Sequence, residues 1–156
     1  SGIECAAMNS STPQMQEGIG MLLAAVRTEI VRSMEAELAA KGIELRYTQF
    51  LILKRLSSLG PITAGELARS IELDGGAMTR QLDQLEGKGY LRRRPHEQDR
   101  RALRIELTEA GQAMTQELMN CNERVLKAAQ RSLDETEQQQ LRDYLTRVLQ
   151  ALRDRH

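Results

Sequence analysis

A short stretch of the sequence concentrates positive charge. Residues 88–104, KGYLRRRPHEQDRRALR, hold seven basic and two acidic residues, a net charge of +5, in a 156-residue chain whose 22 basic and 22 acidic residues balance. Double-stranded DNA carries one phosphate charge per about 1.7 Å of axis, so a basic cluster on a projecting segment is a candidate docking surface for it. The chemistry that this stretch indicates is phosphate binding.

The segment before the basic stretch offers side chains that can read base edges. Met78, Leu82 and Leu85 recur at helical spacing and are expected to face inward. The residues left to face outward, which are candidate DNA contacts, are Gly76, Ala77, Thr79, Arg80, Gln81 and Gln84. An arginine can bind guanine through two hydrogen bonds, and a glutamine can read adenine. The alternative is an ordinary solvated helix face, which the neighbouring charge disfavours.

The basic stretch contains three consecutive arginines, Arg92, Arg93 and Arg94. In a strand their side chains alternate between the two faces, so not all three can meet DNA. We take Arg92 and Arg94 as the candidate contacts. One or two of the three are expected to be plain surface or core-rim residues.

Two short helices must position these side chains. Thr63 and Glu66 form a capping-box pattern at the start of the first helix, and Asp74 is a candidate cap for the second. The second helix is expected to run to about Lys88, where Gly89 ends it. Two helices joined by a short turn are typical of a helix-turn-helix.

A β-hairpin is expected to follow. Residues 90–94 read as a strand, and Leu103, Ile105 and Leu107 alternate with polar residues as a second strand. The polar loop of residues 95–102 joins them. A hairpin after a helix-turn-helix makes a winged helix, and the basic stretch is that hairpin.

Longer helices flank this core. Apolar residues at helical spacing predict helices over residues 13–40, beginning at Thr12-Pro13, over 108–131 and over 135–153, and a further helix over 48–58. Thr108 is expected to cap the second of these, and Asp134, in a capping box with Glu137, the third. The first three stripes exceed what a small core can cover, which predicts a homodimer. The expected fold is mainly α with a small β-hairpin wing: a winged helix-turn-helix core, residues 43–107, flanked by long dimerisation helices in residues 13–42 and 108–156.

The remaining sequence excludes several classes of protein. It has no phosphate loop, GxSxG or HExxH motif and no paired cysteines, so we expect no catalytic residue, metal or cofactor. Apolar stretches are too short for a membrane span, and the chain reads as cytoplasmic. Cys121 is expected to be a small buried hydrophobe. Residues 1–12 are expected to be a disordered N-terminus, and residues 1–7, before Met8, are a candidate non-native extension.

One stretch of the chain resembles a known family. Residues 62–111, ITAGELARSIELDGGAMTRQLDQLEGKGYLRRRPHEQDRRALRIELTEAG, are similar to the winged-helix core of the MarR family of bacterial regulators. The most specific pieces are Asp99-Arg100-Arg101 and the LTEAG sequence of residues 107–111. The flanking helices match in order and length from about residue 13. The TRQLDQLEGKGY sequence looks particularly like the SlyA branch of the family.

The resemblance implies roles for individual residues. Arg100 would be the wing-tip arginine that enters the minor groove, while Asp99 and Arg101 would pair and hold the tip in shape. Gly76, Ala77 and Arg80 fall where family members touch base edges. Because many relatives carry proline or serine in place of Gly76 and Ala77, the operator sequence of those relatives cannot be transferred.

The resemblance also implies partners and regulation. Family members dimerise through their terminal helices and bind inverted-repeat operators, and many release DNA on binding a small, often aromatic and anionic, effector. Arg27, Arg46 and Tyr47 are placed to border such an effector cleft or, equally, are a surface pair and a packed tyrosine. Peroxide-sensing relatives use a cysteine near the start of the first long helix, where this chain has none.

The sequence therefore predicts a homodimeric, sequence-specific double-stranded DNA-binding transcriptional regulator, a repressor by family habit. A small-molecule effector is a candidate further partner. The alternative is a winged-helix protein-interaction module without specific DNA binding, which would leave the charge of the wing without a purpose.

Overall fold

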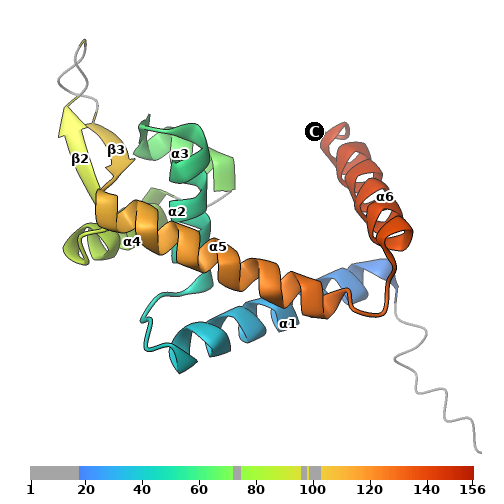
Figure 1. Ribbon diagram of the computed structural model, residues 1–156. Coiled ribbons are helices and arrows are strands. Elements are labelled where there is room, and N and C mark those ends of the chain that lie inside the picture. Colours follow the sequence, from blue (N-terminus) through green and yellow to red (C-terminus); the bar gives the residue numbers. More distant parts are fainter. Residues whose placement is uncertain (1–17, 72–74, 96–97, 99–102) are drawn as a thin grey trace, which may run out of the picture.

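The computed structural model describes residues 18–71, 75–95, 98 and 103–156 (Figure 1). Helices dominate, and three short strands form a small antiparallel sheet. The elements are α1 (Ile19–Ala40), α2 (Tyr47–Leu59), β1 (Ile62–Thr63), α3 (Ala64–Ile71), α4 (Gly75–Gly87), β2 (Leu91–Pro95), β3 (Leu103–Leu107), α5 (Glu109–Ala129) and α6 (Glu135–Arg153). None of these described helices is long and apolar enough to cross a membrane.

The mainly helical winged fold is thus confirmed, and its core lies where the short helices meet the sheet. The fully buried side chains come from α2, α3, α4, both long strands and the adjoining parts of α1 and α5; the largest are Met34, Leu38, Phe50, Ile52, Leu53, Leu67, Met78, Leu82, Leu85, Leu91, Ile105 and Leu118. Burial of each such side chain contributes about 1.5–3 kcal/mol relative to exposure. The core therefore fixes the helix-turn-helix and the hairpin as one unit.

The α4 helix begins and ends close to the predicted positions. Its C-terminal glycine signal is observed: Gly89 has φ 81°, its N–H donates to Glu86 O at 2.9 Å, and Tyr90 N–H donates to Leu85 O at 3.1 Å. This pair of bonds is the Schellman arrangement, which needs a left-handed residue and favours glycine. It turns the chain directly from α4 into the wing.

The sheet has one strand that the sequence did not indicate. β1 pairs with β3, which also pairs with β2, so the order is β1-β3-β2. β1 is only two residues long, too short for a period-2 pattern. In the main pair Leu91 lies opposite Leu107 and both are buried, whereas Leu103 is 48% exposed and is not a core residue.

The first turn of α5 is tied to the base of the wing. The Thr108 hydroxyl accepts a hydrogen bond from Gly111 N at 3.0 Å and donates one to Gly89 O at 2.6 Å. Thr108 N–H donates to Tyr90 O at 3.1 Å. A Cβ atom on Gly111 would lie 1.8 Å from that carbonyl oxygen, so the LTEAG glycine is required by a close backbone approach.

Other predicted boundaries have mixed outcomes. Caps at Thr63, Thr108 and Asp134 are confirmed by hydrogen bonds from the backbone to their side chains. The predicted disordered N-terminus, the helix start at Thr12-Pro13 and the cap at Asp74 lie outside the described residues. The division into a core of residues 43–107 and flanking dimerisation segments stays a prediction.

The close approach at Gly111 gives a first testable prediction. Gly111→Ala should lower the free energy of unfolding by about 1–3 kcal/mol, because the new methyl group must displace the Tyr90 carbonyl. Urea denaturation followed by circular dichroism measures it. Gly87→Ala is the matched control, since a Cβ there meets nothing within 4 Å. Equal stability of the two variants would contradict the assigned packing.

Candidate nucleic-acid interface

The α4 helix presents an uneven outer surface. Met78, Leu82 and Leu85 face the core as predicted. Among the candidate contacts, Gly76, Thr79, Arg80 and Gln84 are exposed, whereas Ala77 and Gln81 are half-buried. Arg80 and Gln84 are four residues apart and so lie on one side of the helix, one turn from each other.

One flank of α4 is bound to the wing. Arg93 of β2 donates to Asp83 Oδ1 at 2.8 Å and to Glu86 Oε1 at 3.0 Å. Both carboxylates are on α4 and substantially exposed, so each ion pair contributes little to stability, about 0–1 kcal/mol. What the two pairs do is hold the first strand of the wing at a fixed place along α4. Arg93 is thus the arginine of the three that faces the protein, as strand alternation required of at least one.

The other two arginines of β2 share a carboxylate. Arg92 Nε lies 2.6 Å and Arg94 Nε 2.7 Å from the same Glu106 oxygen. Glu106 is on β3, directly opposite Arg92 in the sheet. Both arginines remain exposed on that face, so part of the positive charge of the wing is offset by a single acid.

Three of the predicted functional residues belong to the loop expected at the tip of the wing. Asp99, Arg100 and Arg101 lie outside the described residues, so the minor-groove role of Arg100 and the pairing of the other two stay predictions.

The flank of α4 opposite the wing touches α2. Gln49 of α2 is 2% exposed, and its Nε2 donates to Gln84 Oε1 at 3.0 Å. Nearby, the side-chain oxygen of Gln81, Oε1, is buried in the protein, where no described residue donates a hydrogen bond to it. The two glutamines that were expected to read bases are therefore not equivalent: Gln84 stays accessible, and Gln81 is partly withdrawn.

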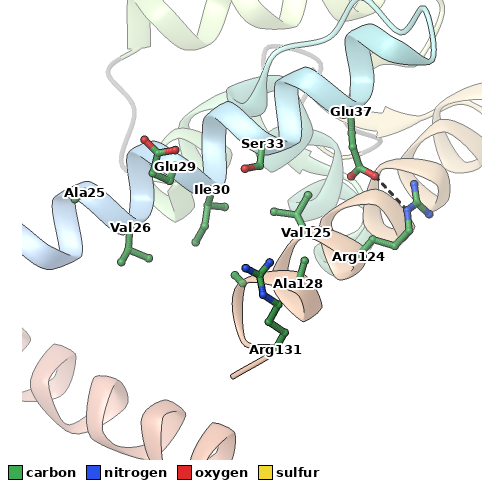
Figure 2. Close-up of a pocket in the computed structure, with 11 residues that line it drawn as sticks. Ala25, Val26, Glu29, Ile30, Ser33, Glu37, Arg124, Val125, Ala128 and Arg131 are labelled. Carbon is green, nitrogen blue, oxygen red and sulfur yellow. Dashed lines mark hydrogen bonds and ion pairs between the residues drawn. The ribbon is translucent and has the colours of Figure 1, made fainter. Parts of the chain in front are cut away.

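The residues suggested for an effector cleft lie where α1 meets α2. The Arg27 guanidinium stacks over the Tyr47 ring, 5.7 Å from its centroid, and Arg46 is 3.8 Å from Glu35. These contacts fit the packed-tyrosine alternative. A separate groove of about 810 Å³ runs between α1 and α5. It is lined by apolar side chains such as Val26, Ile30 and Val125, with charged side chains at its rim (Figure 2).

Cys121 is a fully buried thiol that contacts Glu37, one of the residues lining this groove. Its Sγ lies 3.0 Å from Glu37 Oε2, and Glu37 also accepts from Arg124 Nε at 3.4 Å. Burial, reinforced by the hydrogen bond to Glu37, raises the pKa of Cys121 to about 11. The same hydrogen bond lowers the pKa of the Glu37 carboxyl, with a further contribution from Arg124. The thiol is held protonated, which is the reverse of a redox sensor.

Sequence reasoning found the exposed helix and the charged hairpin, and it missed their connections. Strand alternation already distinguished Arg93 from Arg92 and Arg94. Nothing in the sequence indicated that Arg93 pairs with Asp83 and Glu86. No signal in the sequence linked Gln49 to Gln84, which are 35 residues apart. Among the described residues no cluster of His, Cys, Asp or Glu could hold a metal ion.

The fold and this surface define a winged helix-turn-helix protein with an exposed recognition helix. Residues 45–103 match the family model described as MarR family. MgrA of Staphylococcus aureus, an HTH-type transcriptional regulator, is 30% identical over 111 residues, 71% of this chain and 74% of that protein. The chain belongs to the MarR family.

Other relatives agree with this assignment. The multiple antibiotic resistance protein MarR of Salmonella typhimurium is 35% identical over 82 residues, 53% of this chain, and the match spans only about half (55%) of its length. A solved structure of a mutant MarR from E. coli complexed with operator DNA superposes with a TM-score of 0.76, at 26% identity, covering 90% of this chain and 99% of that one. The SlyA branch stays a prediction.

The buried thiol gives a second testable prediction. In a Cys5→Ser background, Cys121 should react with iodoacetamide at pH 8 at least about a hundredfold more slowly than a free cysteine, because few thiols of pKa about 11 are ionised there and the sulfur is covered. Mass spectrometry of timed samples measures the rate. Adding Glu37→Gln should leave the reaction slow, since burial is the larger cause. Folded-state reactivity equal to that in urea would refute the placement.

Proposed function

We propose that this protein is a homodimeric, sequence-specific double-stranded DNA-binding transcriptional regulator. The observation that carries the proposal is the exposed face of α4, with Arg80 and Gln84 on one side, held between α2 and a cationic hairpin. An α-helix fits the major groove, and the second helix of a helix-turn-helix is the one that enters it. Gly76, Ala77, Thr79, Arg80, Gln81 and Gln84 would face the major groove. Arg92 and Arg94 of the wing would also contact DNA, and Arg100 would enter the minor groove.

The flanking helices support a dimer. α6 has no buried residue, and its apolar side chains Leu141, Leu145, Val148 and Leu152 are 37–53% exposed. The first half of α1 is exposed in the same way, at Ile19, Leu22 and Val26. In Figure 1, α6 stands apart from the helices of the core. Apolar stripes of this length are what a second copy would cover, and exposed Val26 also lines the groove between α1 and α5 (Figure 2).

A two-fold dimer sets the form of the binding site. Two recognition helices related by such an axis would enter successive major grooves about 34 Å apart, which corresponds to an inverted repeat. The role proposed for the dimer is repression in the cytoplasm, with a small aromatic, anionic effector lowering its affinity for DNA. Such an effector acts only through unequal affinity for the DNA-competent and incompetent dimers. The protonated Cys121 favours this mode over thiol oxidation.

Binding of fluorescent genomic duplex fragments, followed by anisotropy across a salt series, tests the proposal. We expect some fragments to bind far more tightly than others, with log K falling steeply and linearly with log salt, because phosphate contacts release counterions. Undetectable or salt-insensitive binding would favour the alternative, a winged-helix protein-interaction module.

Arg80 is expected to specify bases. Arg80→Ala should weaken binding to the preferred duplex by about 1–3 kcal/mol and flatten the preference among duplexes, because a bidentate contact to guanine is lost. Competition titrations against point-substituted duplexes measure both effects. Arg32→Ala, which removes an exposed arginine of α1, is the control. If both variants lose affinity equally for every duplex, Arg80 is only a phosphate contact.

Glu106 is expected to restrain the charge of the wing. Glu106→Gln should make the slope of log K against log salt more negative by about 1–2, because Arg92 and Arg94 are released to neutralise phosphates. Glu123→Gln, on the exposed surface of α5, makes the same charge change away from the wing. Identical slopes for the two variants would show that the shared carboxylate does not limit DNA contact.

A further inference from the structure

The direction of one hydrogen-bond chain determines what the recognition helix can read. We propose that buried Gln49 holds the side-chain amide of Gln84 in one orientation, so that Gln84 offers DNA its N–H donors and not its oxygen. Gln84 is then a specificity-determining residue for bases with acceptors in the major groove. The inference rests on the proposed function, DNA reading by α4, and assigns the chemistry of one contact within it.

The orientation follows from a group that can only donate. The backbone N–H of Arg46, just before α2, donates to Gln49 Oε1 at 3.0 Å. A backbone N–H can donate a hydrogen bond but cannot accept one, so the Gln49 atom that faces it is the oxygen. The other end of the same amide, Nε2, therefore faces Gln84, at 3.0 Å from Oε1 of that residue. Nitrogen and oxygen in a glutamine are assigned from such networks, and here the network leaves one assignment.

The burial of Gln49 keeps this orientation in place. Its side chain is 2% exposed, so a rotated amide would turn a donor toward the donor N–H of Arg46, away from solvent that could compensate. Gln49 also lies at the third position of α2, where a glutamine accepting from the preceding backbone N–H is a capping interaction. The start of α2 therefore fixes the amide of a residue on α4.

The consequence for Gln84 is a reduced set of contacts. A glutamine that reads adenine uses its oxygen for the N6 amino group and its nitrogen for N7. Because the oxygen is turned toward Gln49, Nε2 is the atom that points away from α2 toward DNA. Its N–H groups can donate to guanine N7 and O6 or to thymine O4, whereas at adenine they reach only N7 and leave the N6 amino group without an acceptor. Gln84 is exposed and one helical turn after Arg80, so its contact is expected about one base pair from that of Arg80.

Selection from a randomised duplex library, with sequencing of the bound fraction, tests the inference. For the full chain we expect one pair in each half-site, next to the Arg80-dependent pair, to favour guanine or thymine on the contacted strand. In Gln84→Met the preference at this pair should fall by about five- to hundredfold. Gln112→Met, which alters an exposed glutamine of α5, should leave every pair unchanged.

Gln49→Leu provides the decisive variant. It leaves Gln84 intact and frees its oxygen, so the preference at that single pair should move toward adenine. An unchanged preference in Gln49→Leu, or an adenine preference in the unaltered protein, would overturn the inference while leaving the proposed function intact. If the unaltered protein enriches no sequence at all, the proposed function fails and the inference fails with it.

A measurement on the unaltered protein covers the case in which Gln49→Leu does not fold. Hydrogen exchange of the assigned side-chain amides, followed by NMR, should be slow for the Nε2 protons of Gln49 and fast for those of Gln84. Addition of a selected duplex should slow exchange at Gln84. Slow exchange at Gln84 in the free protein, with fast exchange at Gln49, would reverse the hydrogen bond and overturn the inference.

Discussion

Burial of one side of α4 is the constraint on which the rest of the structure depends. Met78, Leu82 and Leu85 are at most 1% exposed, and each contributes about 1.5–3 kcal/mol by leaving water. Because these three residues fix the rotation of the helix about its axis, they also fix which polar residues face outward. If the recognition helix rotated about its axis by the angle between two successive residues, it would present a different set of side chains to the base pairs.

Polar contacts on both flanks then refine what the apolar core has placed. Arg93 joins α4 to the wing through Asp83 and Glu86, and Gln49 joins α4 to α2 through Gln84. Exposed ion pairs and single hydrogen bonds of this kind add little to global stability, so their value lies in geometry. The charge of the wing is likewise divided: one arginine of the triplet binds the protein, and two share Glu106 on an exposed face.

Much of the fold could be predicted because its signals are local. The capping residues Thr108 and Asp134, the glycine at position 89 and the spacing of apolar residues each act within a few neighbours, and the structure confirms them. The contacts that join elements depend on tertiary packing, as do β1 and the Gln49–Gln84 bond. For the site, apolar spacing identified the exposed helix and composition identified the cationic hairpin, but no local pattern shows that Gln81 is half-buried or that Arg93 pairs with Asp83 and Glu86.

Hydroxyl-radical footprinting of a selected duplex tests most directly the central claim that two copies of α4 read one face of DNA. The account predicts two protected segments of equal strength, related by two-fold symmetry and centred about 10 base pairs apart, as successive major grooves require. One protected segment, or two segments in direct-repeat orientation, would contradict it.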